Sequence, residues 1–148
     1  MSFLATARTI LPAGNWTAAD QATLGYDERL LRRKRLTSDG GVSFMVALRE
    51  TTSLNAGDAL QLDDGRLIVI VAAEEPVVVI KGNLPRLAWH IGNRHTPCQV
   101  TETHLIIRRD PVLEAMLRQL GAEITLAILP FAPEGGAYGL GRTMGHDH

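Results

Sequence analysis

Hydrophobic and polar residues alternate along much of the first half of the chain. Residues 30–36 and 42–48 form two extended runs, and Asp39, Gly40 and Gly41 lie between them. Asp-Gly-Gly between two extended runs is typical of a β-hairpin. Along the second run, apolar residues at Val42, Phe44, Val46 and Leu48 alternate with Ser43, Met45, Ala47 and Arg49. This period of two predicts a strand with one buried face.

A second hairpin is predicted further along the chain. Residues 59–62 lead into Asp63-Asp64-Gly65, and residues 66–73 run back. Turn residues between two strand-like runs again favour antiparallel pairing. We therefore predict that residues 1–73 form a small antiparallel β module.

The hydrophobic period changes after residue 76. Residues 73–76, Ala-Glu-Glu-Pro, are charged and contain a proline, which is typical of a junction between domains. The apolar run at residues 77–81 predicts a strand. The next apolar positions follow the spacing of one helical face, at Leu84, Leu87, Ala88 and Ile91. Gly92 and Asn93 are expected to end this helix, because either residue favours a left-handed backbone.

A second helix is marked more clearly. Residues 98–101 and 104–108 predict two short strands before it. Asp110 suits the cap of the helix, and Pro111 suits its first turn. Its apolar stripe consists of Leu113, Met116, Leu117 and Leu120. Gly121 is expected to end it, and a last strand is predicted over residues 123–131.

The order of these elements predicts the fold class. Strand, helix, strand, strand, helix, strand is the ferredoxin-like βαββαβ pattern, which we predict for residues 76–132. The glycine-rich residues 133–148 are expected to form a flexible tail. The whole chain is thus predicted as α+β and mostly β, with an N-terminal antiparallel β module and a C-terminal ferredoxin-like domain.

Composition and charge limit the range of functions that the chain is expected to have. The chain has 148 residues and a net charge of -1, so no overall field favours nucleic acid or a membrane surface. The longest apolar stretches are far shorter than a transmembrane helix, and we expect no signal peptide. A single cysteine, Cys98, excludes an intrachain disulfide and fits a cytoplasmic protein. The chain lacks the HExxH, P-loop, GxSxG and CxxC motifs of common enzymes.

The segment Gly-Asn-Arg-His-Thr-Pro-Cys at residues 92–98 carries the most chemistry. His95 lies between a predicted helix end and the restricted Thr96-Pro97 step, so its backbone is expected to be fixed and its ring to lie near the surface. Imidazole is a good ligand for nickel, copper and zinc. One histidine is not a complete metal site, and a turn histidine with a structural hydrogen bond is the alternative interpretation.

Several segments together resemble one family. Residues 89–97, Trp-His-Ile-Gly-Asn-Arg-His-Thr-Pro, are similar to a segment of the urease accessory nickel chaperones of the UreE type. Residues 110–116 resemble that family's second helix, and residues 130–139, Pro-Phe-Ala-Pro-Glu-Gly-Gly-Ala-Tyr-Gly, resemble its closing motif. The basic residues 32–35 and the Asp-Gly turns are similar to its N-terminal module, so the resemblance covers nearly the whole chain.

The resemblance implies a nickel metallochaperone of urease maturation, not an enzyme. His95 stands where the family has its central metal ligand. A homodimer would bring two His95 rings to one axis, and such an open site would release its ion readily. The expected cargo is nickel, with zinc and copper as further candidates. The expected partners are urease apoprotein and its accessory proteins, including a GTPase, with no nucleic acid and no membrane.

The C-terminal histidines are further candidate ligands. His146 and His148 flank Asp147 at the end of the chain, and this spacing allows both rings to fold onto one ion. The tail is shorter than in the histidine-rich members of the family, which argues against storage of many ions. The alternative is a tail that takes no part in binding. Some members carry His-Asp-His where this chain has Arg109-Asp110-Pro111, so no accessory metal site is expected there.

Other candidate residues have mainly structural interpretations. Cys98 follows His95 by three residues, but a packed, buried cysteine is favoured over a ligand. His90 and His104 are also expected to be peripheral or structural. The basic cluster consists of Arg29, Arg32, Arg33, Lys34 and Arg35. It fits either a charged edge strand or a docking surface, and a non-metal adaptor for an acidic partner or nucleic acid is the alternative function.

Overall fold

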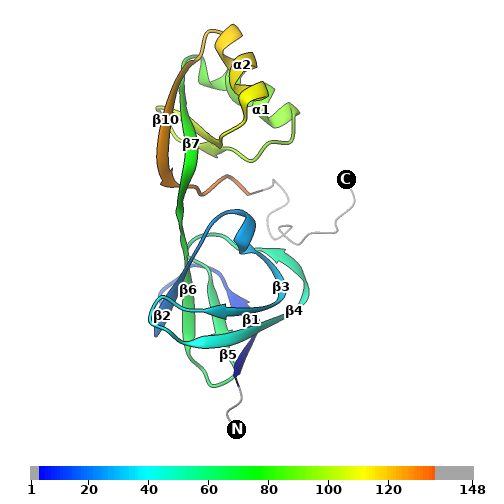
Figure 1. Cartoon of the computed structure of the whole chain (residues 1–148), viewed down its shortest axis with the longest axis vertical. Coiled ribbons are helices and arrows are strands. Elements are labelled where there is room, and N and C mark those ends of the chain that lie inside the picture. The colour runs from blue at the N-terminus through cyan, green and yellow to red at the C-terminus, as the bar shows by residue number, and fades with distance from the viewer. Residues whose placement is uncertain (1–3, 136–148) are drawn as a thin grey trace. The chain divides into compact units, whose positions relative to one another are not determined.

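The computed structural model describes residues 4–135. These residues divide into two compact units on either side of the Ala72–Ala73 bond. Each unit contains one sheet and one hydrophobic core (Figure 1). The described part of the chain is therefore mostly β with few helices, as the sequence predicts.

The N-terminal unit is built around one curled sheet of six strands in its described residues (Figure 1). The order across the sheet is β2-β6-β5-β1-β4-β3. Its elements are β1 (Ala5–Leu11), β2 (Asp20–Leu24), the 3-10 helix η1 (Asp27–Arg29), β3 (Leu30–Thr37), β4 (Ser43–Ser53), β5 (Ala59–Leu62) and β6 (Leu67–Ala72).

Both predicted hairpins are present in this unit. Strands β3 and β4 pair antiparallel, and so do β5 and β6. The alternation in β4 is also confirmed, because Phe44, Val46 and Leu48 are buried in the core.

The prediction of a purely antiparallel module is wrong. Strand β1 pairs with β4 in parallel, and β2 pairs with β6 in parallel. Turn sequences report only the pairing of neighbouring strands, whereas these two pairings join segments far apart in the chain. The sheet is therefore mixed.

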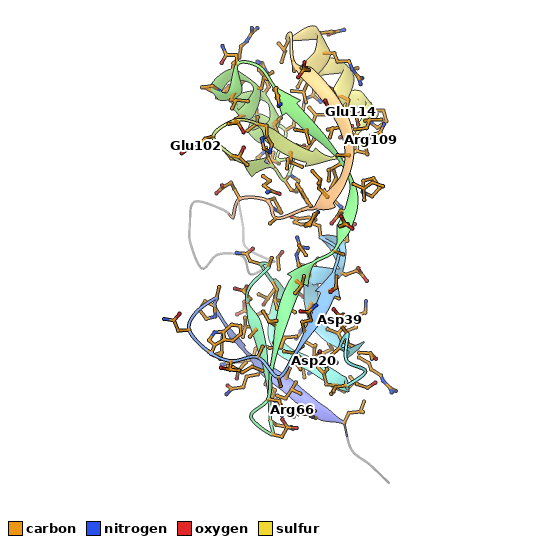
Figure 2. The ribbon with its side chains drawn as sticks, turned by 90° about the vertical axis from the view of Figure 1, so that its left-hand side faces the viewer. Asp20, Asp39, Arg66, Glu102, Arg109 and Glu114 are labelled. Atoms are coloured by element: carbon orange, nitrogen blue, oxygen red, sulfur yellow. The ribbon has the colours of Figure 1, made fainter. Side chains whose placement is uncertain are left out.

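The tip of the β3–β4 hairpin is tied to β2, at the opposite end of the strand order. The Asp39 N–H donates to the Gln21 carbonyl over 2.8 Å. The Asp39 carboxylate accepts from Thr23 Oγ1 at 2.6 Å, and the Asp20 carboxylate accepts from Ser38 Oγ. The side-chain bonds from Ser38 and Thr23 hold the pKa of both carboxyls below the usual aspartate value. They join the hairpin tip to β2 at the two labelled residues (Figure 2).

The C-terminal unit is a four-stranded sheet in the order β10-β7-β9-β8, with all neighbouring strands antiparallel. Both helices lie on one face of this sheet (Figure 1). Its elements are β7 (Glu74–Lys81), α1 (Leu84–Asn93), β8 (Gln99–Val100), β9 (Leu105–Arg108), α2 (Pro111–Gln119) and β10 (Glu123–Pro130). The core between the layers consists of Val78, Ile80, Leu87, Ile91, Leu105, Ile107, Leu113 and Leu117.

The two units meet at Ala72–Ala73, beside the predicted junction, but three of its four residues are part of a strand. Strand β7 begins at Glu74, and Glu74, Glu75 and Pro76 pair with the end of β10. The proline is tolerated because pairing with β9 begins only at Val77, so Pro76 has one neighbouring strand.

None of the helices among residues 4–135 is long and apolar enough to cross a membrane.

Candidate metal centre

Helix α1 sets the position of the segment that carries His95. Asn83 caps the start of the helix, where its side-chain oxygen accepts from the Arg86 N–H at 3.2 Å. Leu87 and Ile91 are buried against the sheet and fix the rotation of the helix. The C-terminal end of α1 is therefore anchored to the core within one turn of His95.

His95 itself ends the helix, in a left-handed conformation with φ of 57°. Its N–H donates to the Gly92 carbonyl at 2.9 Å, and the Thr96 N–H donates to the Ile91 carbonyl at 3.4 Å. These two bonds form a Schellman motif in which His95 takes the position that glycine usually fills. The prediction that Gly92 or Asn93 would be left-handed is wrong, because both remain in the helix.

The left-handed conformation is unfavourable for a residue with a β-carbon. It costs an L-residue on the order of 1–2 kcal/mol, although histidine tolerates it better than most. The backbone bonds of the motif hold His95 in place against this cost. Strain of this kind gathers at functional sites, where it fixes the direction of a side chain.

Both His95 and the aromatic side chain of Trp89 are accessible to solvent. His95 is exposed, and Trp89 on α1 is 63% exposed. The Trp89 and His90 rings meet edge to face, with centroids 5.0 Å apart. Within residues 4–135 no group of three or more His, Cys, Asp or Glu side chains is arranged to hold a metal ion. His95 therefore has no complete ligand set in the described part of one chain.

Cys98 does not offer a thiolate beside His95. Its side chain is partly buried and packs against the core of the C-terminal unit. Burial raises the pKa of the Cys98 thiol to about 11, and the charge of Glu134 adds to this effect. The thiol is thus protonated at neutral pH, which agrees with the structural interpretation of this residue.

The other two histidines of the described chain make local contacts. His104 Nδ1 lies 2.8 Å from Thr103 Oγ1, and its backbone is held by Thr101 in the turn between β8 and β9. His90 is partly buried against Trp89. Both fit the structural roles that the sequence favours.

His146 and His148 lie outside the described residues. The last described segment nevertheless returns toward the loop that follows His95. The Ala132 N–H donates to Gln99 Oε1 at 3.0 Å, and the Glu134 N–H donates to the Cys98 carbonyl at 2.9 Å. The chain therefore passes beside Cys98 at Glu134. No motif in the sequence predicts this contact.

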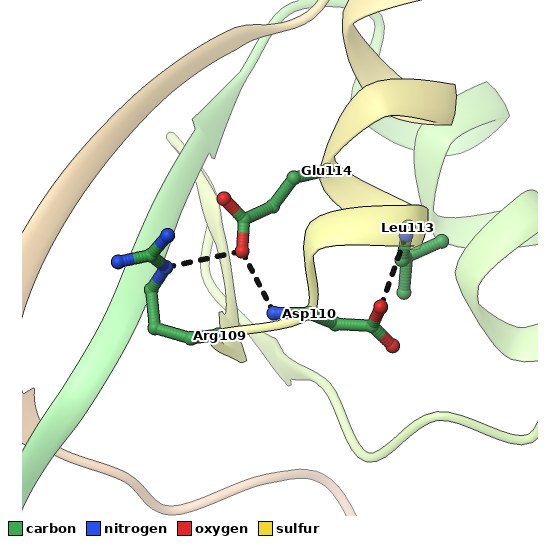
Figure 3. A network of polar contacts seen from close by, with 4 residues as sticks. All are labelled: Arg109, Asp110, Leu113 and Glu114. Carbon is green, nitrogen blue, oxygen red and sulfur yellow. Dashed lines mark hydrogen bonds and ion pairs between the residues drawn. The ribbon is translucent and has the colours of Figure 1, made fainter.

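The start of α2 is occupied by a polar network (Figure 3). Asp110 caps the helix, where its carboxylate accepts from the Leu113 N–H at 3.1 Å. Glu114 is 2% exposed and accepts from the Asp110 N–H at 2.7 Å and from Arg109 Nε at 3.1 Å. The prediction that Asp110 is a helix cap is confirmed. Glu114 was not among the residues singled out from the sequence, although its spacing of four residues from Asp110 was a possible signal.

The charge of Glu114 is stabilised despite its burial. Burial raises the pKa of this carboxyl, but the hydrogen bonds from Arg109 and Asp110 and the positive charge of Arg109 outweigh it. The pKa of Glu114 therefore lies below its ordinary value. Its two described hydrogen bonds are structural, because they tie the start of α2 to Arg109 and Asp110.

The basic cluster is smaller than the sequence suggests. Arg29 is 2% exposed and donates from Nη1 to the Leu24 carbonyl at 2.9 Å, so it belongs to the interior of the N-terminal unit. Arg32, Arg33, Lys34 and Arg35 are all exposed on β3. Only these four residues are available to a docking surface.

Comparison with known proteins agrees with both units. The N-terminal domain of the UreE urease accessory protein matches residues 7–73, and its C-terminal domain matches residues 75–148. The urease accessory protein UreE of Rhodobacter capsulatus is 56% identical over 149 residues, covering 100% of this chain and 96% of that protein. UreE of Ruegeria pomeroyi is 54% identical, covering 98% and 99%, and UreE of Paracoccus denitrificans is 64% identical, covering 83% and 79%.

These matches place the chain among accessory proteins of urease rather than among enzymes. The chain belongs to the UreE urease accessory protein family. The family resemblance inferred from residues 89–97 and 130–139 is therefore confirmed, and the chain has a role in urease maturation.

Proposed function

We propose that this chain is a nickel metallochaperone, which binds nickel as a homodimer through His95 and delivers it to urease apoprotein. The observation that carries the proposal is the exposed imidazole of His95 on a strained, anchored backbone. A carrier needs a ligand that is held in one direction and still reachable by the receiving protein.

The homodimer follows from the chemistry of the ligand set. One imidazole cannot hold nickel by itself, and residues 4–135 contain no further cluster of suitable ligands. A two-fold axis would bring two copies of His95 to one ion without any additional residue. The remaining coordination positions stay open, which favours exchange over retention. Imidazole also suits zinc and copper, so these ions are expected competitors.

The tail is proposed to supply His146 and His148 to the same ion. The Glu134 N–H donates to the carbonyl of Cys98, which follows His95 by three residues. The tail therefore begins beside the loop that carries His95. The twelve residues from Glu134 to His146 can span at most roughly 40 Å, which is ample for return to the loop.

The two units are proposed to divide the work. Residues 1–73 would bind partner proteins, and residues 76–132 would bind metal and dimerise. We class the C-terminal unit as ferredoxin-like, supported by its strand order β10-β7-β9-β8 with helices on one face. The partners would be urease apoprotein and its accessory proteins, including a GTPase, in the cytoplasm.

Calorimetric titration with nickel tests the proposal directly. His95→Ala should abolish the tightest binding while the free energy of unfolding stays nearly unchanged, because alanine keeps a β-carbon on the same left-handed backbone. His104→Ala is the matched control, since it removes an imidazole of the same unit that is engaged with Thr103. Unchanged tight binding in the His95 variant would reject the proposal.

A further inference from the structure

The middle of β3 presents four consecutive cations on the surface of the N-terminal unit. Arg32, Arg33, Lys34 and Arg35 are exposed, and β3 is the last strand on its side of the sheet. In the described part of the chain none of these four side chains makes a hydrogen bond or an ion pair. Arg66 of the same unit, by contrast, pairs with Asp64 at 2.8 Å. The cations of β3 therefore lack carboxylate partners within the described chain.

The register of the β3–β4 pair tells which of these side chains face outward together. Lys34 lies opposite the buried Val46, so it is on the core side of the strand at the edge of the sheet. Arg33 lies opposite Ala47 and Arg35 lies opposite Met45. Since opposite residues share a face, Arg33 and Arg35 both extend on the outer face of the sheet. The regular register is interrupted at Arg32.

The hydrogen bonding of the hairpin also tells which backbone groups are available. The Ser38 N–H donates to the Val42 carbonyl at 2.8 Å, which fixes the alternation of bonded and non-bonded pairs. The pairs Leu36–Phe44 and Lys34–Val46 lie two and four residues before Ser38 in the same register, so they are also bonded pairs. The backbone N–H and C=O groups of Leu36 and Lys34 therefore point toward β4. Arg33 and Arg35 turn theirs toward the free edge. These two arginines thus combine an unpaired strand edge with two outward guanidinium groups.

We propose that β3 accepts an extended acidic segment of a partner protein, which adds as a further strand beside Arg33 and Arg35. The partner's backbone would pair with the free edge, and its carboxylates would pair with the guanidinium groups. This deepens the partner-binding role proposed for the N-terminal unit and is independent of the nickel site. An acidic partner also relieves the mutual repulsion of four adjacent cations.

Two observations favour a protein segment over nucleic acid. An edge strand offers alternating N–H and C=O groups, which match a peptide backbone and not a sugar-phosphate backbone. Strands β3 and β4 contain one aromatic residue, Phe44, and it is fully buried, so these two strands present no aromatic side chain for stacking bases.

Fluorescence anisotropy with labelled synthetic peptides tests the inference. The probe is an eight-residue peptide of alternating glutamate and threonine, and the full-length protein is titrated at low and high salt. We expect binding that weakens with salt, and no binding of the same peptide with lysine in place of glutamate. N-methylation of one alternate set of peptide nitrogens should weaken binding about tenfold, because those nitrogens face β3, and methylation of the other set should not.

Matched charge reversals locate the site. The double variant Arg33→Glu, Arg35→Glu should lose about tenfold or more in peptide affinity, because two attractions become repulsions. Arg86→Glu, Arg118→Glu changes the net charge equally on exposed residues of the other unit and should bind as wild type. Circular dichroism and nickel titration of the β3 variant should match wild type, so failure of this inference is distinguishable from failure of the nickel proposal.

Four outcomes would overturn the inference. They are absence of binding to the acidic peptide, equal binding of the lysine peptide, equal binding of both N-methylated peptides, and tighter binding of an eight-nucleotide oligothymidylate. The first would mean that the charges only keep strand edges apart. The last would mean that the surface serves nucleic acid.

Discussion

The two helices of the C-terminal unit end in the same backbone motif with different residues. At the end of α2, Gly121 is left-handed with φ of 88°, and its N–H donates to the Arg118 carbonyl at 3.0 Å. The Ala122 N–H donates to the Leu117 carbonyl at 3.0 Å. At the end of α1 the same pair of bonds is made by His95 and Thr96.

We interpret the difference as that between a turn with a structural role alone and a turn that carries the proposed metal ligand. Glycine adopts the left-handed region without steric penalty, so the end of α2 is the unstrained form of the motif. The end of α1 keeps the geometry but carries an exposed imidazole where glycine would be more stable. Because folding does not favour histidine there, the strained position is consistent with the metal-binding role proposed for the His95 ring.

The largest effect is expected when the histidine of α1 is replaced by the residue of α2. His95→Gly should weaken nickel binding at least about a hundredfold, since the imidazole is lost. The same change should raise the free energy of unfolding by about 1 kcal/mol, because the strained backbone relaxes. Calorimetry and urea denaturation measure the two quantities. A variant that loses nickel and also loses stability would contradict the assignment of strain.

Adding a side chain at the end of α2 should lower the stability of the fold and leave nickel binding unchanged. Gly121→Ala should lower the free energy of unfolding by about 1–2 kcal/mol, because a β-carbon enters the left-handed region. Apart from Gly121 and its two chain neighbours, no described residue has an atom within 4 Å of the site of this β-carbon, so the effect reports backbone strain rather than a clash. Gly121→Asn is the control and should lose less. Equal stability of the alanine variant and wild type would refute the parallel between the two helix ends.

The opposite end of α2 gives a smaller, pH-dependent effect. Glu114→Gln should lower the free energy of unfolding by about 1 kcal/mol at neutral pH, because the bond to Arg109 loses its charge. The pKa of Glu114 is lowered in the folded state. Its stabilising contribution is therefore full above the ordinary glutamate pKa of about 4.3, and it is lost as the pH falls through the folded pKa.

Urea denaturation of wild type and Glu114→Gln at a series of pH values from neutral to acidic measures this pH dependence of the free energy of unfolding. The two stability curves should converge on acidification, when Glu114 is protonated in both states. Curves that remain parallel throughout would show that the charge of Glu114 has no part in the network.

The smallest effect is expected at Cys98. Cys98→Ser should leave nickel affinity within about twofold of wild type, because a buried, protonated thiol is not a ligand. The pKa of about 11 also predicts slow alkylation near pH 8. Calorimetry and timed reaction with iodoacetamide measure both. A large loss of affinity would assign Cys98 to the metal site.

Local signals predicted most of the elements but not the long-range pairings. The turns at residues 37–41 and 63–65 gave both hairpins, and Asp110 and Gly121 gave the two ends of α2. Strands β1 and β2 were not predicted, because no turn marks them and their parallel partners are distant in sequence.

The candidate site shows the same limit. His95 was identified from its neighbours in sequence, but its left-handed backbone was assigned to Gly92 or Asn93, the residues with the lowest penalty there. Backbone propensity favours the unstrained residue, so it does not predict a strained position such as that of His95, where we propose a metal ligand. The contact of Glu134 with Cys98 depends on how β10 returns across the unit, and local patterns do not contain that information.

Native mass spectrometry of mixed dimers can show whether two His95 rings share one nickel ion. Wild-type and His95→Ala chains would be mixed, allowed to exchange, and loaded with limiting nickel. The account predicts one tightly bound nickel on wild-type dimers and strongly reduced nickel on both mixed and double-variant dimers, because each ion needs two His95 rings. One nickel per chain, or equal nickel on dimers without His95, would contradict it.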